Sequence, residues 1–226
     1  MRWRSFASVS PADPTSAHRR AALGVTLVLP WALVGQRARA GAQQNEPLAD
    51  AVRGALAALI ADTAPPQRKF ERTEDRLAFI DWLAEMSRRL SSREPEYRNR
   101  VDLLRTLDYE CTRAGLDRQM VLGLIQVESG FRRYAISPVG ARGYMQVMPF
   151  WASLIGDGNA RRLFEMRTNL RYGCVILRHY LDREQGDLFR ALGRYNGSVG
   201  RPEYPQAVLA AWRGQWSYVA RAKDGQ

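Results

Sequence analysis

Hydrophobic residues recur every three or four positions over most of the chain, which is the spacing of one face of an α-helix. Short stretches rich in glycine and proline interrupt this pattern and predict turns or loops between the helices. No alternation of hydrophobic and polar residues is long enough to predict a strand. The expected fold class is therefore all-α. The predicted helices span residues 47–62, 73–90, 97–114, 118–128, 149–155, 170–184, 187–195 and 204–215.

The predicted helix 118–128 is hydrophobic on nearly all of its faces, which is typical of a helix in the centre of a core. Asp117 is placed to cap its beginning, and its last polar residue is Glu128. Burial disfavours a charged carboxylate and raises its pKa, so such a carboxyl can act as a general acid near neutral pH. The residue type alone also allows a glutamate that faces solvent or pairs with Arg132 or Arg133.

The charge of the chain adds a constraint on its partners. The 226 residues carry a net charge of +11, of which residues 1–40 contribute +5, so the remainder carries +6. This balance favours an anionic partner, such as a nucleic acid, a cell-wall polymer or a membrane surface. No basic run is interleaved with aromatic residues, so the nucleic-acid interpretation is disfavoured.

The beginning of the chain is typical of a targeting signal. Arginines precede an apolar stretch at residues 21–34, which has the length of a signal-peptide core and is short for a membrane span. Small residues at positions 38–42 offer cleavage sites, and no cysteine lies near them to carry a lipid anchor. We therefore expect a signal peptide at residues 1–42 and a periplasmic protein that is not a lipoprotein. An uncleaved anchor or an N-terminal helix is the alternative.

The two cysteines of the chain, Cys111 and Cys174, each fall on the hydrophobic face of a predicted helix. They are either two small buried hydrophobic residues or, in an exported protein, a candidate disulfide. The two histidines, His18 and His179, are isolated in the sequence, so neither a metal site nor a cofactor is expected.

Four separated motifs resemble the lytic transglycosylase domain of the soluble family, which has a lysozyme-like fold. They are "ESGF" with Glu128, "SPVGARGYMQVMP" from Ser137, "NLRYG" at 169–173 and "RYNGS" at 194–198. Their order and spacing are more specific than any single motif. The resemblance covers residues 100–212. It implies a lysozyme-like catalytic domain at residues 95–226, preceded by a helical N-terminal extension at residues 43–94.

The resemblance also implies the reaction. Glu128 corresponds to the family's single catalytic glutamate, which acts first as acid and then as base on the bond between N-acetylmuramic acid and N-acetylglucosamine of peptidoglycan. The product is a 1,6-anhydromuramic acid, and the glycan strands are the expected partner. Arginines of residues 43–94 are candidates for contact with the wall or a membrane surface. A lysozyme-type hydrolase and a non-catalytic wall-binding or assembly protein are the alternatives.

The remaining motif residues correspond to positions that bind substrate in the family. Ser137 matches a serine that bonds the muramoyl sugar, although a serine before a proline is also an ordinary turn residue. Gln146 and Met148 match residues that line the cleft, and packing in the core is also compatible with Met148. Tyr195 matches a tyrosine near the acid, whose hydroxyl binds substrate or stabilises developing charge. Asn196 is expected to organise its loop.

Two positions depart from the family pattern. Tyr144 replaces a leucine, and we expect it to narrow a subsite or to offer a stacking surface for a sugar. Arg194 replaces an alanine and is placed either to meet carboxylates of the substrate or to face solvent. Asn169, with Thr168, is expected to cap the helix that follows it.

Overall fold

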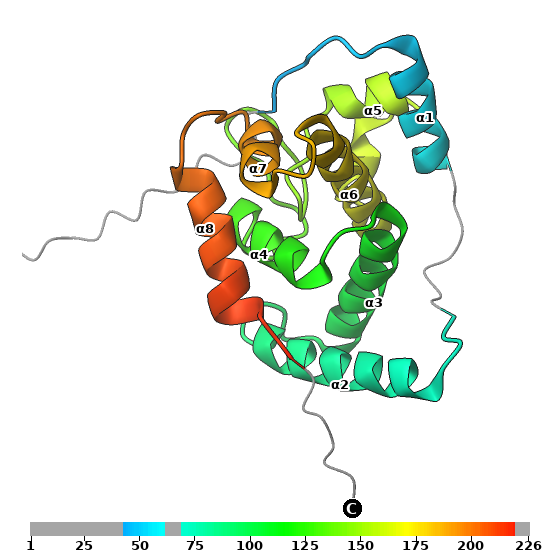
Figure 1. Cartoon of the computed structure of the whole chain (residues 1–226), viewed down its shortest axis with the longest axis vertical. Helices are drawn as coiled ribbons and strands as arrows, with labels where there is room; N and C mark the ends of the chain where they lie inside the picture. The colour runs from blue at the N-terminus through cyan, green and yellow to red at the C-terminus, as the bar shows by residue number, and fades with distance from the viewer. Residues whose placement is uncertain (1–42, 62–68, 220–226) are drawn as a thin grey trace, which may run out of the picture. The chain divides into compact units, whose positions relative to one another are not determined.

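Helices account for nearly all regular structure in the computed structural model, which describes residues 43–61 and 69–219 (Figure 1). Within these residues there is no strand, only two isolated bridges that join Ile136 to Arg142 and Arg142 to Val147. The all-α prediction is confirmed. The α-helices are α1 (Asp50–Ala61), α2 (Thr73–Leu90), α3 (Tyr97–Ala114), α4 (Arg118–Glu128), α5 (Phe150–Ile155), α6 (Met166–Arg183), α7 (Leu188–Asn196) and α8 (Glu203–Ala211). A 3-10 helix, η1 (Ala160–Phe164), and a π-helical turn, η2 (Trp212–Trp216), complete the set.

Local sequence signals explain where several of these helices begin and end. Gly115 follows α3 with φ of 61°, a left-handed conformation that glycine adopts without steric cost. The Asp117 carboxylate accepts hydrogen bonds from the backbone N–H groups of Gln119 (2.7 Å) and Met120 (2.9 Å), which caps α4 as expected. The bounds of α2 and α3 are those predicted from the hydrophobic period.

Two predicted helices were placed wrongly. The helix α6 begins at Met166 after an extended Glu165, four residues before the predicted start, so Asn169 lies inside the helix and is not its cap. The predicted helix 204–215 ends at Ala211, and its remaining residues form the π-helical turn η2. Helix ends are the part of a helix that a hydrophobic pattern places least well.

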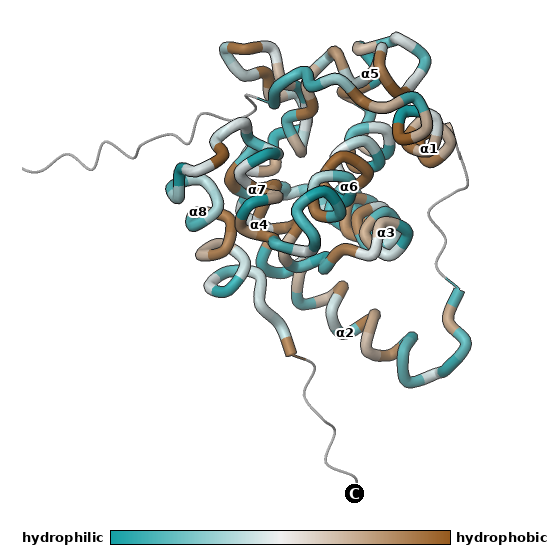
Figure 2. Tube along the Cα trace, turned by 45° about the horizontal axis from the view of Figure 1, so that its top comes forward, coloured by the Kyte–Doolittle hydropathy of each residue, from teal (hydrophilic) through white to brown (hydrophobic). Residues whose placement is uncertain are grey.

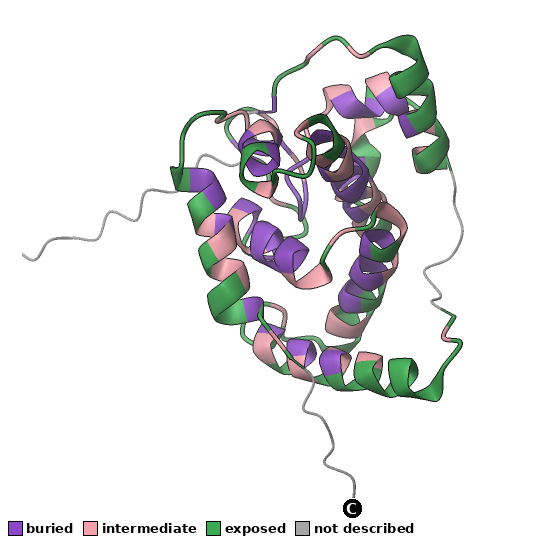
Figure 3. Cartoon of the chain, in the orientation of Figure 1, coloured by how far each residue is buried: buried purple, intermediate pink, exposed green. Residues whose placement is uncertain are grey.

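The core is organised around α4, which contacts α3, α8 and η2. Figure 3 shows α4 as buried over most of its length, and Leu122, Leu124 and Ile125 have no exposed surface. Burying each such side chain stabilises a fold by about 1.5–3 kcal/mol. Gly123 allows the close approach of η2, because a Cβ atom there would lie 2.9 Å from the backbone nitrogen of Trp212. The prediction of a central core helix is confirmed.

The helices that precede this core are more exposed. Leu56 is the buried residue of α1, which contacts α5 and α6. Along α2 hydrophobic and hydrophilic residues alternate (Figure 2), and Trp82 and Met86 of its second half are buried whereas Leu77 and Ile80 of its first half are exposed. The extension expected at residues 43–94 is therefore helical, and its boundary at residue 94 stays a prediction.

The signal peptide and cleavage site expected at residues 1–42 lie outside the described residues, as do residues 62–68 between α1 and α2. Among the residues that are described, no helix has the length and hydrophobicity needed to cross a membrane.

Candidate active site

The side chain of Glu128 lies at the end of α4 and is 4% exposed. Burial raises its pKa from 4.5 to about 8, and a hydrogen bond from the Tyr204 hydroxyl opposes that rise. No charged side chain contributes to the change, so the described residues place no second carboxylate beside it. The carboxyl group is therefore protonated at neutral pH, and no charged side chain of the described residues affects its pKa.

Tyr204 is the partner of Glu128 that the sequence did not indicate. It stands in the first turn of α8, 76 residues away in sequence, and its hydroxyl donates to Glu128 Oε1 over 2.5 Å. Burial and the neighbouring carboxylate raise the pKa of Tyr204 well above 10, so the hydroxyl keeps its proton. Glu128 Oε2 is buried and has no hydrogen-bond partner among the described residues. The Tyr204 hydroxyl thus fixes Oε1 by a hydrogen bond, and Oε2 is available for proton transfer to a substrate.

The loop from Ser129 to Met148 is held in place by Asn169 of α6. The Asn169 side chain accepts a hydrogen bond from Met145 N and donates to the carbonyl oxygens of Arg142 and Leu163, each over 2.8 Å. A Cβ atom at Gly143, where φ is 75°, would lie 2.4 Å from the Asn169 amide nitrogen. Asn169 therefore acts as a clamp between α6 and this loop, which corrects its expected role as a helix cap.

Ser137 closes a tight turn around Pro138. Its hydroxyl oxygen accepts from Ala141 N over 3.1 Å, and its own backbone N–H donates to the Ala141 carbonyl over 3.0 Å. Ser137 therefore has the turn-forming role that its position before a proline suggested. The hydroxyl can still donate one hydrogen bond, so the proposed bond to a sugar remains a prediction.

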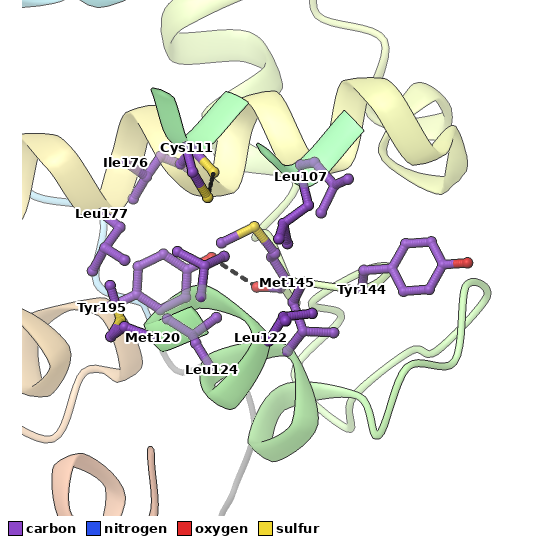
Figure 4. Close-up of a cluster of buried hydrophobic side chains, with 14 of the residues drawn as sticks. Leu107, Cys111, Met120, Leu122, Leu124, Tyr144, Met145, Ile176, Leu177 and Tyr195 are labelled. Carbon is purple, nitrogen blue, oxygen red and sulfur yellow. Dashed lines mark hydrogen bonds between the residues drawn. The ribbon is translucent and has the colours of Figure 1, made fainter. Parts of the chain in front are cut away.

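The structure turns two of the expected substrate-binding side chains toward protein. Tyr144 is 3% exposed, so no ring face is open for a sugar to stack on, and it points away from the buried cluster in Figure 4. Gln146 is 1% exposed and donates from its amide nitrogen to the carbonyl oxygens of Ala135 (3.1 Å) and Gly143 (2.9 Å). Both side chains shape the loop, and a direct contact with substrate stays a prediction.

Met148 is half-buried, and its backbone N–H donates to the Gln43 side-chain oxygen over 3.4 Å. Gln43 is 4% exposed, so a residue of the N-terminal extension contacts the expected wall of the cleft. Nothing in the sequence indicated this contact, because 105 positions separate the two residues.

The two expected residues of α7 are also buried. Tyr195 has no exposed surface, and its hydroxyl donates to the Met145 carbonyl over 2.8 Å (Figure 4). Burial and the negative charge of Glu128 raise its pKa well above 10. Asn196 is 7% exposed, and its side-chain oxygen has no hydrogen-bond partner in the described part of the chain. In this structure Tyr195 fixes the loop through Met145, and its predicted contact with substrate is untested.

Arg194 is neither free for substrate nor simply solvated. Its guanidinium group pairs with Glu184 and, over 3.4 Å, with Glu46 of the N-terminal extension. Its charge is therefore already matched by two carboxylates, and the expectation that it meets substrate carboxylates is not supported.

Cys111 of α3, labelled in Figure 4, and Cys174 of α6 are free thiols, each 1% exposed, and their sulfur atoms lie 4.0 Å apart. Burial raises the pKa of Cys111 well above its usual range. Both cysteines are buried, as one of the two interpretations expects, and no disulfide joins them in this structure. Within residues 43–61 and 69–219, no group of three or more histidine, cysteine, aspartate or glutamate side chains is placed to hold a metal ion.

The fold and the site define an all-α protein with one buried, protonated carboxyl group at the end of its central helix. Residues 106–206 match the family model described as "Transglycosylase SLT domain". This region of the chain is a transglycosylase SLT domain. The match contains Glu128, its partner Tyr204 and the clamp Asn169.

Curated relatives agree with this assignment over part of their length. The chain is 37% identical to a "Transglycosylase" of Enterobacteria phage PRD1 over 89 residues, covering 39% of the chain and 32% of that protein. It is 32% identical to the "Membrane-bound lytic murein transglycosylase C" of Haemophilus influenzae (strain PittEE) over 103 residues, which are 39% of the chain and 29% of the relative. The chain thus spans about a third of the length of these relatives.

A solved structure is also similar. It is an inactive mutant of the lytic transglycosylase Slt from Pseudomonas aeruginosa, with a TM-score of 0.45 and 23% sequence identity. The similarity covers 61% of the chain and 28% of that structure.

Proposed function

We propose that this chain is an exported lytic transglycosylase that cleaves the bond between N-acetylmuramic acid and N-acetylglucosamine in peptidoglycan. The observation that carries the proposal is the state of Glu128: its carboxyl is buried, its pKa is about 8, and one of its oxygens has no partner among the described residues. The SLT domain at residues 106–206 supports the same reaction class.

In the first step, the protonated Glu128 transfers its proton to the glycosidic oxygen as the bond from that oxygen to C1 of the muramoyl sugar breaks. A carboxyl with a pKa near 8 holds that proton at neutral pH. Since the described residues place no second carboxylate beside Glu128, the positive charge that develops at C1 is met by the substrate's own 2-acetamido oxygen. This arrangement differs from the usual pair of carboxylates in glycosidases.

In the second step, the Glu128 carboxylate removes the proton from the C6 hydroxyl of the muramoyl sugar, and the C6 oxygen bonds to C1. The product is a 1,6-anhydro sugar, and Glu128 recovers its proton, so no water is consumed. The hydrogen bond from Tyr204 stabilises the carboxylate between the two steps. This hydrogen bond lowers the pKa of Glu128 and so favours release of the proton in the first step, whereas burial keeps the pKa high enough for the carboxyl to be protonated at neutral pH.

The loop from Ser129 to Met148 presents the sugar to this carboxyl. The Ser137 hydroxyl and the half-buried Met148 side chain are the groups that we assign to contact with substrate. Gln146, Tyr195 and Asn169 hold the loop in shape.

A lysozyme-type hydrolase is the second candidate, because the same acid serves both reactions and water competes with the C6 hydroxyl for C1. The burial of Glu128 favours the anhydro product, since little water reaches the carboxyl. We also propose that residues 1–42 direct export to the periplasm.

Digestion of peptidoglycan sacculi by the purified protein, followed by mass spectrometry of the soluble products, tests the proposal. We expect anhydromuropeptides from the wild type and none from Glu128→Gln. The matched control is Glu74→Gln, which removes an exposed glutamate from α2 and should leave the release unchanged. Reducing muramic acid in the products would establish the hydrolase, and binding without any release would establish a non-catalytic protein.

A further inference from the structure

The acid of the candidate active site is covered by protein in this structure. Glu128 is 4% exposed, and Oε2, the oxygen available for proton transfer, is buried. General acid catalysis requires the donor to lie within hydrogen-bond reach of the atom that receives the proton. A sugar cannot come that close to a buried oxygen, so some segment that covers Glu128 moves when a substrate binds.

Residues 43–49, which we call the strap, begin close to this acid and run from α7 to α1 (Figure 1). The side-chain oxygen of Gln43 accepts a hydrogen bond from Met148 N over 3.4 Å, and Gln43 is 4% exposed. Burial raises the pKa of Tyr195, the negative charge of Glu128 adds to the rise, and the side chain of Gln43 opposes it. Gln43 and Glu128 thus both act on one tyrosine, which places Gln43 near the acid.

The strap is held mainly by side chains at its surface. Among the residues that the structure describes, no backbone–backbone hydrogen bond joins residues 43–48 to another segment. Glu46 forms ion pairs with Arg183 and, over 3.4 Å, with Arg194, but the side chains of Glu46 and Arg183 are 31% and 41% exposed. Exposed ion pairs stabilise a structure weakly. Leu48 packs partly against the core, and most of the strap is exposed (Figure 3).

The other neighbours of the acid are fixed by the core. Tyr204 of α8 is 3% exposed, and Tyr195 of α7 has no exposed surface and donates to the Met145 carbonyl over 2.8 Å. Displacing either tyrosine would disrupt the packing of a helix against α4 or the loop that follows it. The strap makes fewer contacts of this kind, and α1 beyond it has Leu56 as its buried residue. Of these neighbours, the strap therefore moves at the lowest cost.

We propose that the strap is an autoinhibitory lid, which lies against Met148 in this structure and is displaced by a glycan strand that binds next to Glu128. This inference rests on the proposed function, because it takes a glycan strand as the ligand. The strap and the strand compete for the same wall of the cleft, since we assign the Met148 side chain to contact with substrate. The measured affinity for the strand is then reduced by the fraction of molecules in which the strap is closed.

Loosening the strap tests the proposal through binding. Soluble glycan strands, freed of their peptides by an amidase, are titrated into the Glu128→Gln protein so that no cleavage occurs. Adding Gln43→Ala and Glu46→Gln removes the hydrogen bond to Met148 and the two ion pairs. We expect this variant to bind the strands about 3- to 10-fold more tightly, because it is open more often. The matched control is Gln44→Ala with Glu71→Gln, which removes an exposed amide and an exposed carboxylate and should leave the affinity unchanged.

Locking the strap tests the same idea in the opposite direction. Glu46→Cys with Arg183→Cys replaces one ion pair by two thiols that a cleavable cross-linker can join. The native Cys111 and Cys174 are buried, so the reagent should react at the two new positions. The cross-linked protein should bind glycan strands much more weakly, and cleavage of the cross-link should restore binding.

Several outcomes would overturn the lid. Equal affinity in the parent and the loosened variant would do so, as would the absence of binding in both. Weaker binding by the loosened variant would make the strap a part of the binding wall, and unchanged binding by the cross-linked protein would show that the strap need not move. Failure of the proposed reaction is distinguishable, since it removes anhydromuropeptide release from the wild type and leaves these binding differences intact.

Discussion

Replacing Glu128 by glutamine should make the stability of this protein less dependent on pH. The pKa of Glu128 is about 8 in the folded protein, because of burial, and 4.5 is its ordinary value in an unfolded chain. Between these values the folded protein keeps a proton that the unfolded chain releases. The free energy of unfolding of the wild type therefore falls as the pH rises from 4.5 toward 8, by about 1.4 kcal/mol per pH unit.

The whole effect amounts to roughly 5 kcal/mol, the free energy that corresponds to the difference between 4.5 and about 8. Glutamine has no such proton, so this contribution is absent from Glu128→Gln. The variant should gain stability relative to the wild type as the pH rises and reach its full advantage above pH 8. A constant offset of about 1–3 kcal/mol against the variant is expected as well, because its amide nitrogen replaces a buried oxygen without a partner.

Urea unfolding of both proteins at several pH values between 4 and 9 measures the difference. The test is how the difference in the free energy of unfolding between variant and wild type changes with pH. The constant offset does not bear on the protonation of Glu128. Taking the difference also cancels the groups that titrate equally in both proteins. Glu74→Gln controls for the loss of one exposed carboxylate. A difference that stays constant from pH 4 to pH 9 would refute the inference that burial keeps Glu128 protonated.

Three further predictions address the surroundings of the acid. Tyr204→Phe removes the hydrogen bond to the Glu128 carboxylate, which is worth about 1.5–3 kcal/mol. Because that bond lowers the pKa of Glu128, its loss should move the alkaline limb of the pH–rate profile to higher pH, and the rate at neutral pH should fall. An alkaline limb at the same pH in both proteins would contradict this. Asn169→Ala leaves three buried backbone groups without partners and should lower the free energy of unfolding by about 3–5 kcal/mol, measured by urea unfolding; a loss below about 1 kcal/mol would contradict the clamp. Cys111 and Cys174 are free and buried, so thiol titration should find almost no reactive thiols in the folded protein. After denaturation without reductant it should find two thiols per chain. No reactive thiols in the denatured protein would show a disulfide.

Much of the fold was predictable because a helix is a local structure. The hydrophobic period placed α2 and α3, and Gly115 and Asp117 marked the break between α3 and α4. Glu128 was also visible as a candidate, since it ends a helix that is apolar on nearly every face, and the structure decided that its side chain is buried and does not face solvent.

Contacts between distant segments were not predictable in this way. The partner of Glu128 is Tyr204, 76 residues further on, and it reaches the acid because α8 packs on α4. Asn169 lies in the first turns of α6 and bonds to a loop that precedes it by more than 20 residues, whereas its sequence context suggested a helix cap. Arg194 pairs with Glu46, 148 positions away. The sequence by itself determined most of the helices and which acid ends the apolar helix, because both follow from the spacing of neighbouring side chains. Only the tertiary structure decided which groups hold that acid and its loop, because these contacts depend on how the helices pack.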